Sequence, residues 1–247
     1  MNFIKNILGR IFAFWALVVF VPTMLIAFIP IWLAGLWPEP KRTKIFQIAS
    51  AIWMRVFFFF TGIRLLVKGK QNFEKNKNYI VVCNHNSFMD VPITTPFIPG
   101  PPNKTIAKME MAKIPVFGMI YRRGSVLVNR KSEESRKASL VKMREVLSLG
   151  LHMCIYPEGT RNKTTEPLQR FHDGAFRLAI DTGKPILPTV IFNTAKVLPA
   201  EKSFFFWPVA IRIHYLEPIP ADKSMSVSEL REKVFAIMKD HYTHHNH

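Results

Sequence analysis

The chain has 247 residues, and 34 Lys or Arg against 17 Asp or Glu give a formal net charge of +17. Hydrophobic residues make up 49% of it and the mean hydropathy is +0.10, which excludes a disordered chain. With only 11 Gly and 2 Cys, a collagen-like chain and a disulfide scaffold are excluded as well. A basic surface favours an anionic partner: nucleic acid, an anionic membrane or a phosphorylated substrate.

The apolar residues gather near the N-terminus. Residues 11–38 carry no formal charge, a run longer than a signal-peptide core of about 7–15 residues and longer than the roughly 20 residues of a membrane span. Pro22 and Pro30 interrupt the run, and basic residues flank both of its ends. These features favour a retained hairpin that dips into one leaflet. A single span followed by an interfacial helix, or a buried helix pair in a soluble protein, are the alternatives.

A second apolar stretch, residues 45–63, predicts an amphipathic helix with a wide apolar side. At 100° per residue, its polar face is narrow and carries Lys44, Gln47 and Arg55. We therefore expect residues 1–62 to form a two-helix, monotopic, membrane-associated element. Residues 63–247 are expected to form a separate domain.

From residue 63 onward, short apolar runs alternate with longer polar ones. The runs predict seven strands, at residues 64–67, 79–83, 105–107, 125–128, 152–156, 186–192 and 209–216. Helices are predicted at residues 132–149, 173–182 and 226–242. This alternation predicts an α/β fold with a mostly parallel or mixed sheet flanked by helices. The chain has no Gly-rich phosphate loop, so nucleotide hydrolysis has no support.

The Cys and His residues do not predict a metal site. Cys83 and Cys154 lie in apolar runs and are expected to be small buried hydrophobes. No Cys and His spacing matches a zinc site. The histidines of the C-terminal tail, residues 241–247, are expected to belong to a frayed polar terminus.

The first motif with catalytic chemistry is VVCNHNSFMDVP, residues 81–92. His85 follows a predicted strand at its carboxyl end, where α/β proteins place their sites. Asp90 comes five residues later and can hold one ring nitrogen of His85, which makes the other a general base. The alternative is structural, because Ser87 and Asp90 have the spacing of a capping box.

Two further motifs bring basic residues to the ends of strands. CIYPEGTRN, residues 154–162, contains Gly159, which permits close backbone approach, and Arg161, whose planar fork suits phosphate. GSVLVNR, residues 124–130, delivers Arg130 to the same end of the sheet. The alternatives are a solvated loop and a surface arginine.

Taken in order with the segment PILP at residues 185–188, these motifs resemble the blocks of the glycerolipid acyltransferase family. Within that family, the chain is similar to the bacterial 1-acyl-sn-glycerol-3-phosphate (lysophosphatidic acid) acyltransferases. The resemblance covers about residues 64–220.

The resemblance implies acyl transfer from a thioester to the sn-2 hydroxyl of 1-acyl-glycerol-3-phosphate, giving phosphatidic acid in phospholipid biosynthesis. It implies His85 as the general base and Asp90 as the residue that orients it. The residues it implies in substrate binding are Lys108, Arg130, Glu158, Gly159, Thr160 and Arg161. It implies no cofactor or metal beyond acyl-coenzyme A or acyl-acyl carrier protein as co-substrate.

The expected partners are anionic membrane lipid, lysophosphatidate and the carrier of the thioester, at the cytoplasmic face of the inner membrane. Nucleic acid is not expected, because the aromatic residues gather in the apolar N-terminal region. Another acceptor stays open: glycerol 3-phosphate, a lysophospholipid or lyso-ornithine lipid. A non-catalytic membrane-surface scaffold and a basic nucleic-acid binder are the non-enzymatic alternatives.

Overall fold

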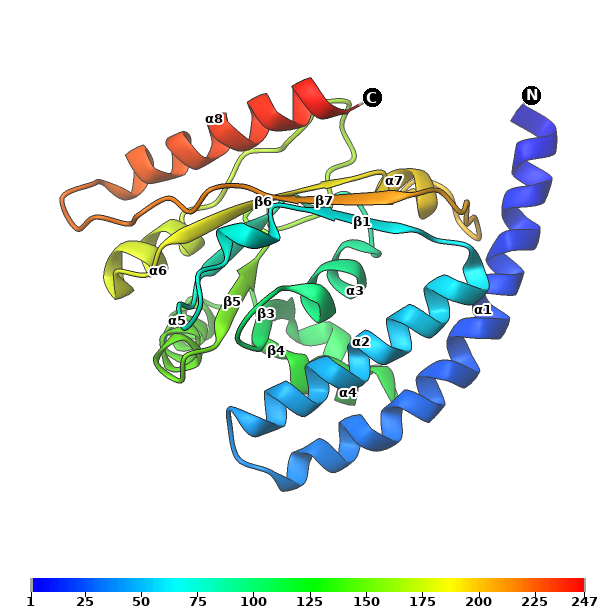
Figure 1. Cartoon of the computed structure of the whole chain (residues 1–247), viewed down its shortest axis with the longest axis horizontal. Helices are drawn as coiled ribbons and strands as arrows, with labels where there is room; N and C mark the ends of the chain where they lie inside the picture. The colour runs from blue at the N-terminus through cyan, green and yellow to red at the C-terminus, as the bar shows by residue number, and fades with distance from the viewer. Residues whose placement is uncertain (1, 247) are drawn as a thin grey trace.

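A seven-stranded mixed sheet forms the centre of the molecule (Figure 1), in a computed structural model that describes residues 2–246. The strands are β1 Leu65–Lys68, β2 Ile80–Cys83, β3 Asn103–Lys108, β4 Ser125–Val128, β5 His152–Ile155, β6 Ile186–Phe192 and β7 Ile211–Tyr215. They are ordered β1-β7-β6-β2-β5-β3-β4, and β6 pairs with β7 antiparallel while every other pair is parallel. The predicted fold class and all seven predicted strands are therefore confirmed.

Helices cover both faces of the sheet. One face carries α5 Glu133–Ser148, α6 Gly174–Thr182 and α8 Val227–His245, and the other carries α1 Asn2–Leu33 and α2 Lys41–Thr61. The remaining helices are short: α3 Asp90–Thr94, α4 Phe117–Gly124, α7 Thr194–Val197, and the 3₁₀ turns η1 Ala34–Leu36, η2 Lys70–Asn72, η3 Thr95–Phe97 and η4 Met109–Lys113.

The sheet has two separate apolar faces because strand side chains alternate. On β2, Val81 and Cys83 pack toward α2, whereas Ile80 and Val82 pack toward α6 and α8. All four are fully buried, which explains why the central strands are continuous apolar runs instead of alternating ones.

The structure corrects the prediction that Pro22 and Pro30 interrupt the first apolar run. Both lie inside α1, which bends along its length but continues to Leu33. Packing against α2 stabilises the helix at the first proline, since Trp53 Nε1 donates a hydrogen bond to Thr23 Oγ1 at 3.1 Å. The chain therefore reverses direction after α1 has ended, at residues 34–40. The two arms of the hairpin are α1 and α2.

The second arm turns part of its polar stripe, Gln47, toward the protein, whereas Lys44 and Arg55 of the same stripe are exposed. Gln47 accepts a hydrogen bond from the Asn103 amide at 3.1 Å and donates one to Ile98 O at 3.2 Å. The outward face carries Ile48, Ile52 and Phe59, which is 81% exposed. A helix that exposes large apolar side chains, with the basic residues Lys44 and Arg55 also exposed, has the character expected of a helix at a lipid surface.

Both helices are long and apolar enough to cross a membrane, and only 22% of the apolar window in the first is buried. This exposure argues against the alternative of a core helix pair in a soluble protein. The division into residues 1–62 and 63–247 stays a prediction.

The prediction of a frayed C-terminal tail is wrong for the residues that the structure describes. The helix α8 continues to His245, and His241 Nε2 lies 2.9 Å from His214 Nδ1 on β7. Ring packing of His241 on His245, with centroids 4.1 Å apart, keeps the last turn helical. His247 lies outside the described residues.

Candidate active site

The loop after β2 holds His85 against the first residue of α3. His85 Nδ1 lies 2.7 Å from Asp90 Oδ2, and the same oxygen accepts the backbone N–H groups of Asn86 at 2.6 Å and Ser87 at 2.7 Å. A carboxylate can only accept, so Nδ1 carries the proton and Nε2 is left as the basic nitrogen. The pair has the geometry of a general base with its orienting acid.

The alternative interpretation of this motif, a capping box formed by Ser87 and Asp90, is observed only in part. Asp90 bonds back to the Ser87 N–H as in a capping box, but Ser87 Oγ donates to Leu198 O at 2.8 Å. The bonds to Asn86 and Ser87 therefore shape the loop, while the third bond to Asp90 fixes the imidazole.

The turn after β5 holds the backbone of His85 from both sides. The His85 N–H donates to Glu158 Oε1 at 2.7 Å, and the Asn162 N–H donates to His85 O at 2.6 Å. The ring of Tyr156 lies 4.8 Å from that of His85. The position of the imidazole therefore depends on two loops that lie more than 70 residues apart in the sequence.

Glu158 faces these loops and not an open surface. It is 2% exposed, and its second oxygen accepts the Gln169 N–H at 3.0 Å. Burial raises the pKa of Glu158 to about 7, against the lowering effect of the hydrogen bonds from His85 and Gln169. The carboxylate joins three segments of the loop region.

Gly159 lets two side chains approach the turn. Its φ is +71°, and a Cβ there would lie 2.9 Å from the ring of His172 and 3.6 Å from Arg130 Nη1. The Gly159 N–H is already bonded to Tyr156 O at 3.0 Å. The structure thus brings Arg130, from the end of β4, to the turn after β5.

The other residues predicted to bind substrate lie at or beyond the carboxyl ends of the strands. The Arg161 guanidinium sits 3.7 Å above the ring of Phe88, and burial lowers the pKa of Arg130 below its ordinary value. Thr160 is exposed, with its Oγ1 donating to Arg161 O at 3.2 Å. Lys108 ends β3 and is exposed, separated from β2 by β5 in the sheet.

Several residues that shape the site lie inside the motifs without having a predicted role. Asn84 extends the sheet with its side chain, which donates to Ile191 O at 2.9 Å and accepts from Ile191 N at 2.7 Å. Tyr156, Asn162 and Phe88 contact His85 or Arg161 directly. Their nearness within residues 81–92 and 154–162 is the only sequence signal for them.

Metal-ligating groups do not cluster in the part of the chain that the structure describes. Within residues 2–246, three or more His, Cys, Asp or Glu side chains nowhere converge as a metal site. Cys83 and Cys154 are free and buried, with sulfur atoms 3.9 Å apart.

Comparison with known proteins finds relatives that are named as acyltransferases. The chain is 32% identical to the 1-acyl-sn-glycerol-3-phosphate acyltransferase of Borreliella burgdorferi over 57% of its own length and 56% of the relative. It is 30% identical to the enzyme of that name from Cocos nucifera, over 83% of this chain and 66% of the relative. The chain thus spans less than two thirds of the length of these curated relatives.

The whole architecture also has a solved counterpart. The crystal structure of the 1-acyl-sn-glycerophosphate (LPA) acyltransferase PlsC from Thermotoga maritima superposes with a TM-score of 0.80 at 26% identity, covering 99% of this chain and 97% of that one. The model of the family described as Acyltransferase matches residues 64–192, more than half of the chain and the segment that carries both halves of the site. The chain belongs to the acyltransferase family.

Proposed function

We propose that the protein transfers an acyl chain from an acyl thioester to the sn-2 hydroxyl of 1-acyl-glycerol-3-phosphate, giving phosphatidic acid. The observation that carries the proposal is the His85–Asp90 pair, 2.7 Å apart, in a chain that belongs to the acyltransferase family. The names of its relatives in Borreliella burgdorferi and Cocos nucifera support this acceptor.

In the proposed reaction, the acceptor supplies the nucleophile. His85 Nε2 removes the proton of the sn-2 hydroxyl as its oxygen attacks the thioester carbonyl carbon, and Asp90 stabilises the imidazolium that forms. The C–S bond of the tetrahedral intermediate then breaks, and the imidazolium returns the proton to the departing thiolate. The substrates bring all the reacting groups, so the reaction needs no covalent acyl-enzyme, metal or further cofactor.

The intermediate requires hydrogen-bond donors for its oxyanion. The Gly159 amide is bonded to Tyr156 O, so we assign this role to the next amides of the same turn, those of Thr160 and Arg161. The guanidinium groups of Arg130 and Arg161 suit the acceptor phosphate, because each offers a planar fork of donors. Lys108 is the third candidate for this contact, from the end of β3.

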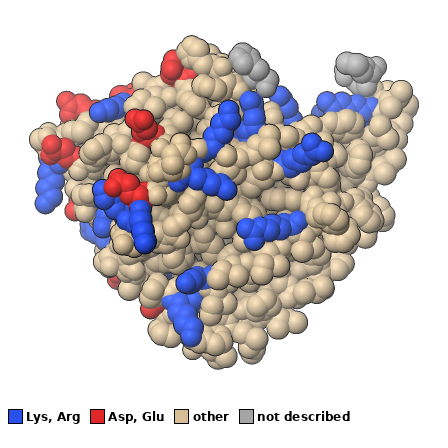
Figure 2. Space-filling model, in the orientation of Figure 1, with Lys and Arg blue, Asp and Glu red and all other residues tan. Residues whose placement is uncertain are grey.

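The helices α1 and α2, both long and apolar enough to cross a membrane, support a membrane location for the proposed reaction. Figure 2 shows a largely uncharged surface at the lower right, over α1 and the adjoining part of α2, with Lys and Arg side chains on the rest of this face and Asp and Glu side chains among them at the left. We propose a monotopic placement at the cytoplasmic face of the inner membrane, with anionic lipid as the partner of the basic surface. The acceptor then reaches His85 from the bilayer.

The test is acylation of lysophosphatidate by the purified protein, with coenzyme A and acyl carrier protein thioesters as separate donors. We expect His85→Ala to lose at least about a thousandfold in turnover and to keep its membrane binding. His244→Ala, at an exposed position of α8, is the matched control and should stay active. Retained turnover in His85→Ala would contradict the assignment of the base, and turnover only with glycerol 3-phosphate or another lysolipid would contradict the acceptor.

A further inference from the structure

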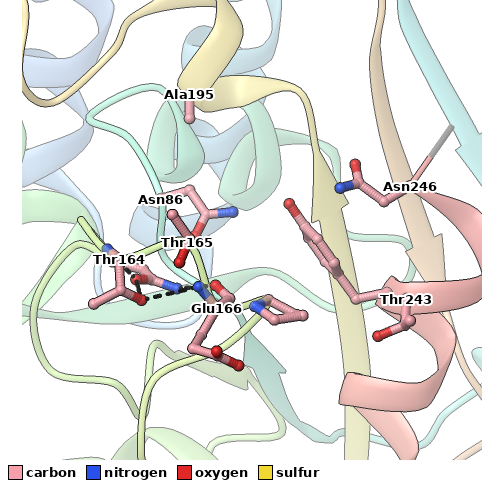
Figure 3. Close-up of a pocket in the computed structure, with 10 residues that line it drawn as sticks. Asn86, Thr164, Thr165, Glu166, Ala195, Thr243 and Asn246 are labelled. Carbon is pink, nitrogen blue, oxygen red and sulfur yellow. Dashed lines mark hydrogen bonds between the residues drawn. The ribbon is translucent and has the colours of Figure 1, made fainter.

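A polar pocket opens beside the His85 loop. It has a volume of about 300 Å³ and lies between the 162–167 loop, α7 and the last turns of α8. Figure 3 shows Asn86, Thr164, Thr165 and Glu166 facing Thr243 and Asn246 across the pocket, with Ala195 above them. Asn86 is the residue next to His85, and the Asn162 N–H bonds to His85 O at 2.6 Å, so the pocket wall and the catalytic loop share their backbone.

The pocket offers hydrogen bonds and almost no charge. Among the described residues of its lining, Glu166 is the one with a charge, and the other polar groups are neutral amides and hydroxyls. Asn162 Oδ1 is used within the wall, where it accepts from Thr164 N at 2.8 Å and Thr164 Oγ1 at 2.7 Å. A cavity of this kind is poorly suited to phosphate and well suited to a ligand with amide and hydroxyl groups.

The α8 wall of the pocket lies on the opposite side of the sheet from the apolar helices. Tyr242 of α8 packs on Phe192, with ring centroids 5.1 Å apart, in the core between the sheet and α8. The helices α1 and α2 cover the other face. His85 leaves β2 between these two faces, so an amphiphile from the bilayer and a water-soluble group can reach its loop from different sides.

We propose that this pocket binds the pantetheine arm of the thioester donor. The arm carries two secondary amides and a hydroxyl and ends at the thioester sulfur, and it is common to coenzyme A and acyl carrier protein. In this arrangement the arm enters from the α8 side, the thioester arrives at His85, and the acyl chain continues toward the apolar helices. The inference rests on the proposed function, because it deepens the assignment of the donor.

The experiment compares three donors with the same acyl chain: acyl-coenzyme A, acyl-acyl carrier protein and acyl-N-acetylcysteamine, which lacks most of the arm. Ala195→Trp fills the pocket from an exposed position of α7, and Tyr242→Phe removes one hydroxyl while keeping the ring on Phe192. Lys196→Trp, at the neighbouring exposed position outside the lining, is the matched control. Thermal unfolding of each variant checks that it folds.

We expect Ala195→Trp to lower kcat/KM by about tenfold or more for both full-length donors, and Tyr242→Phe by about two- to tenfold. Neither variant should change kcat/KM for the truncated donor or the KM for lysophosphatidate, and Lys196→Trp should match wild type. In detergent, free pantetheine should give saturation-transfer NMR signals with wild type that Ala195→Trp removes.

Three results would overturn the pocket assignment: equal losses with all three donors, no loss with either full-length donor, or a loss with only one of those two. Failure of the proposed function looks different, since wild type would then show no lysophosphatidate acylation with any donor. Pantetheine binding to wild type is measured without turnover and therefore tests the pocket in either case.

Discussion

One oxygen of Asp90 accepts the hydrogen bonds that fix the geometry of the proposed His85–Asp90 dyad. Oδ2 accepts from the His85 ring and from two backbone amides, and Asp90 is fully buried. Because the acid is held by the loop that it shapes, its position is fixed before substrate binds. This preorganisation is what a general base requires to keep one tautomer.

We expect Asp90→Asn to lower kcat by about 10²–10⁴-fold, since an amide at this position can donate to Nδ1 and stabilise the wrong tautomer. Measurement of kcat and of thermal unfolding together separates this effect from loss of fold. Asp222→Asn, at an exposed site of the chain, is the control. An Asp90→Asn enzyme with normal kcat would contradict the role of Asp90.

Glu158 makes stability depend on pH. Its pKa is about 7 in the folded protein against an ordinary 4.5, so the folded state binds the proton more tightly than the unfolded state. The stability contributed by protonation is full below about pH 4.5 and is lost as pH rises through about 7, up to about 3 kcal/mol in all. In Glu158→Gln this dependence of stability on pH should vanish.

The measurement is thermal unfolding in detergent across this pH range. Wild type should lose stability relative to Glu158→Gln as the pH rises, and Glu166→Gln, an exposed position of the same loop, should follow wild type. Parallel curves for wild type and Glu158→Gln would contradict the raised pKa.

Arg161 is expected to act on the acceptor and not on the chemical step. Its guanidinium lies 3.7 Å from the centre of the Phe88 ring, a cation–π contact that positions it beside the loop of His85. Arg161→Ala should raise the KM for lysophosphatidate by about 10–100-fold with little change in kcat. Arg144→Ala on α5 is the control, and an unchanged KM in Arg161→Ala would contradict phosphate binding.

At the scale of elements, the hairpin of α1 and α2 shows how tertiary packing overrides local signals. Prolines predict helix breaks, yet α1 passes both because α2 packs along it, with Phe20 and Trp53 ring centroids 5.1 Å apart. The strands were predictable, since apolar runs bounded by polar segments needed no knowledge of their neighbours. The last turn of α8 was not, because it depends on His214 from a distant strand.

The outward face of α2 gives a test of the membrane placement. Ile52→Glu puts a charge on an apolar, exposed side chain of α2, whereas Val141→Glu does the same on α5, on the other face of the sheet. We expect Ile52→Glu to weaken vesicle binding by at least about tenfold and Val141→Glu to leave it unchanged. Equal losses in the two variants would contradict a membrane face formed by α2.

At the scale of the whole molecule, strand order lies beyond the reach of the local pattern. Motifs around His85 and Arg161 were predicted to share a sheet edge, which required only that their strands be parallel, as β2 and β5 are. The antiparallel placement of β7, and the pocket built from Asn86, Ala195 and Tyr242, depend on contacts between residues at least 20 positions apart. Periodicity carries no information about such contacts.

The net charge of +17 is a property of the whole chain, and it predicts how salt acts on binding. Anionic vesicles should bind more tightly than zwitterionic ones, by about 1 kcal/mol for each basic residue near the surface. Raising salt from about 0.1 M to about 1 M shortens the Debye length from about 10 Å to about 3 Å and should abolish this preference. The apolar contribution of α1 and α2 is not screened, so binding common to both vesicle types should remain.

His85→Ala should behave as wild type in this assay, because its change lies in the site and not on the surface. Tight salt-sensitive binding to DNA, with no preference between the vesicles, would instead assign the basic surface to nucleic acid.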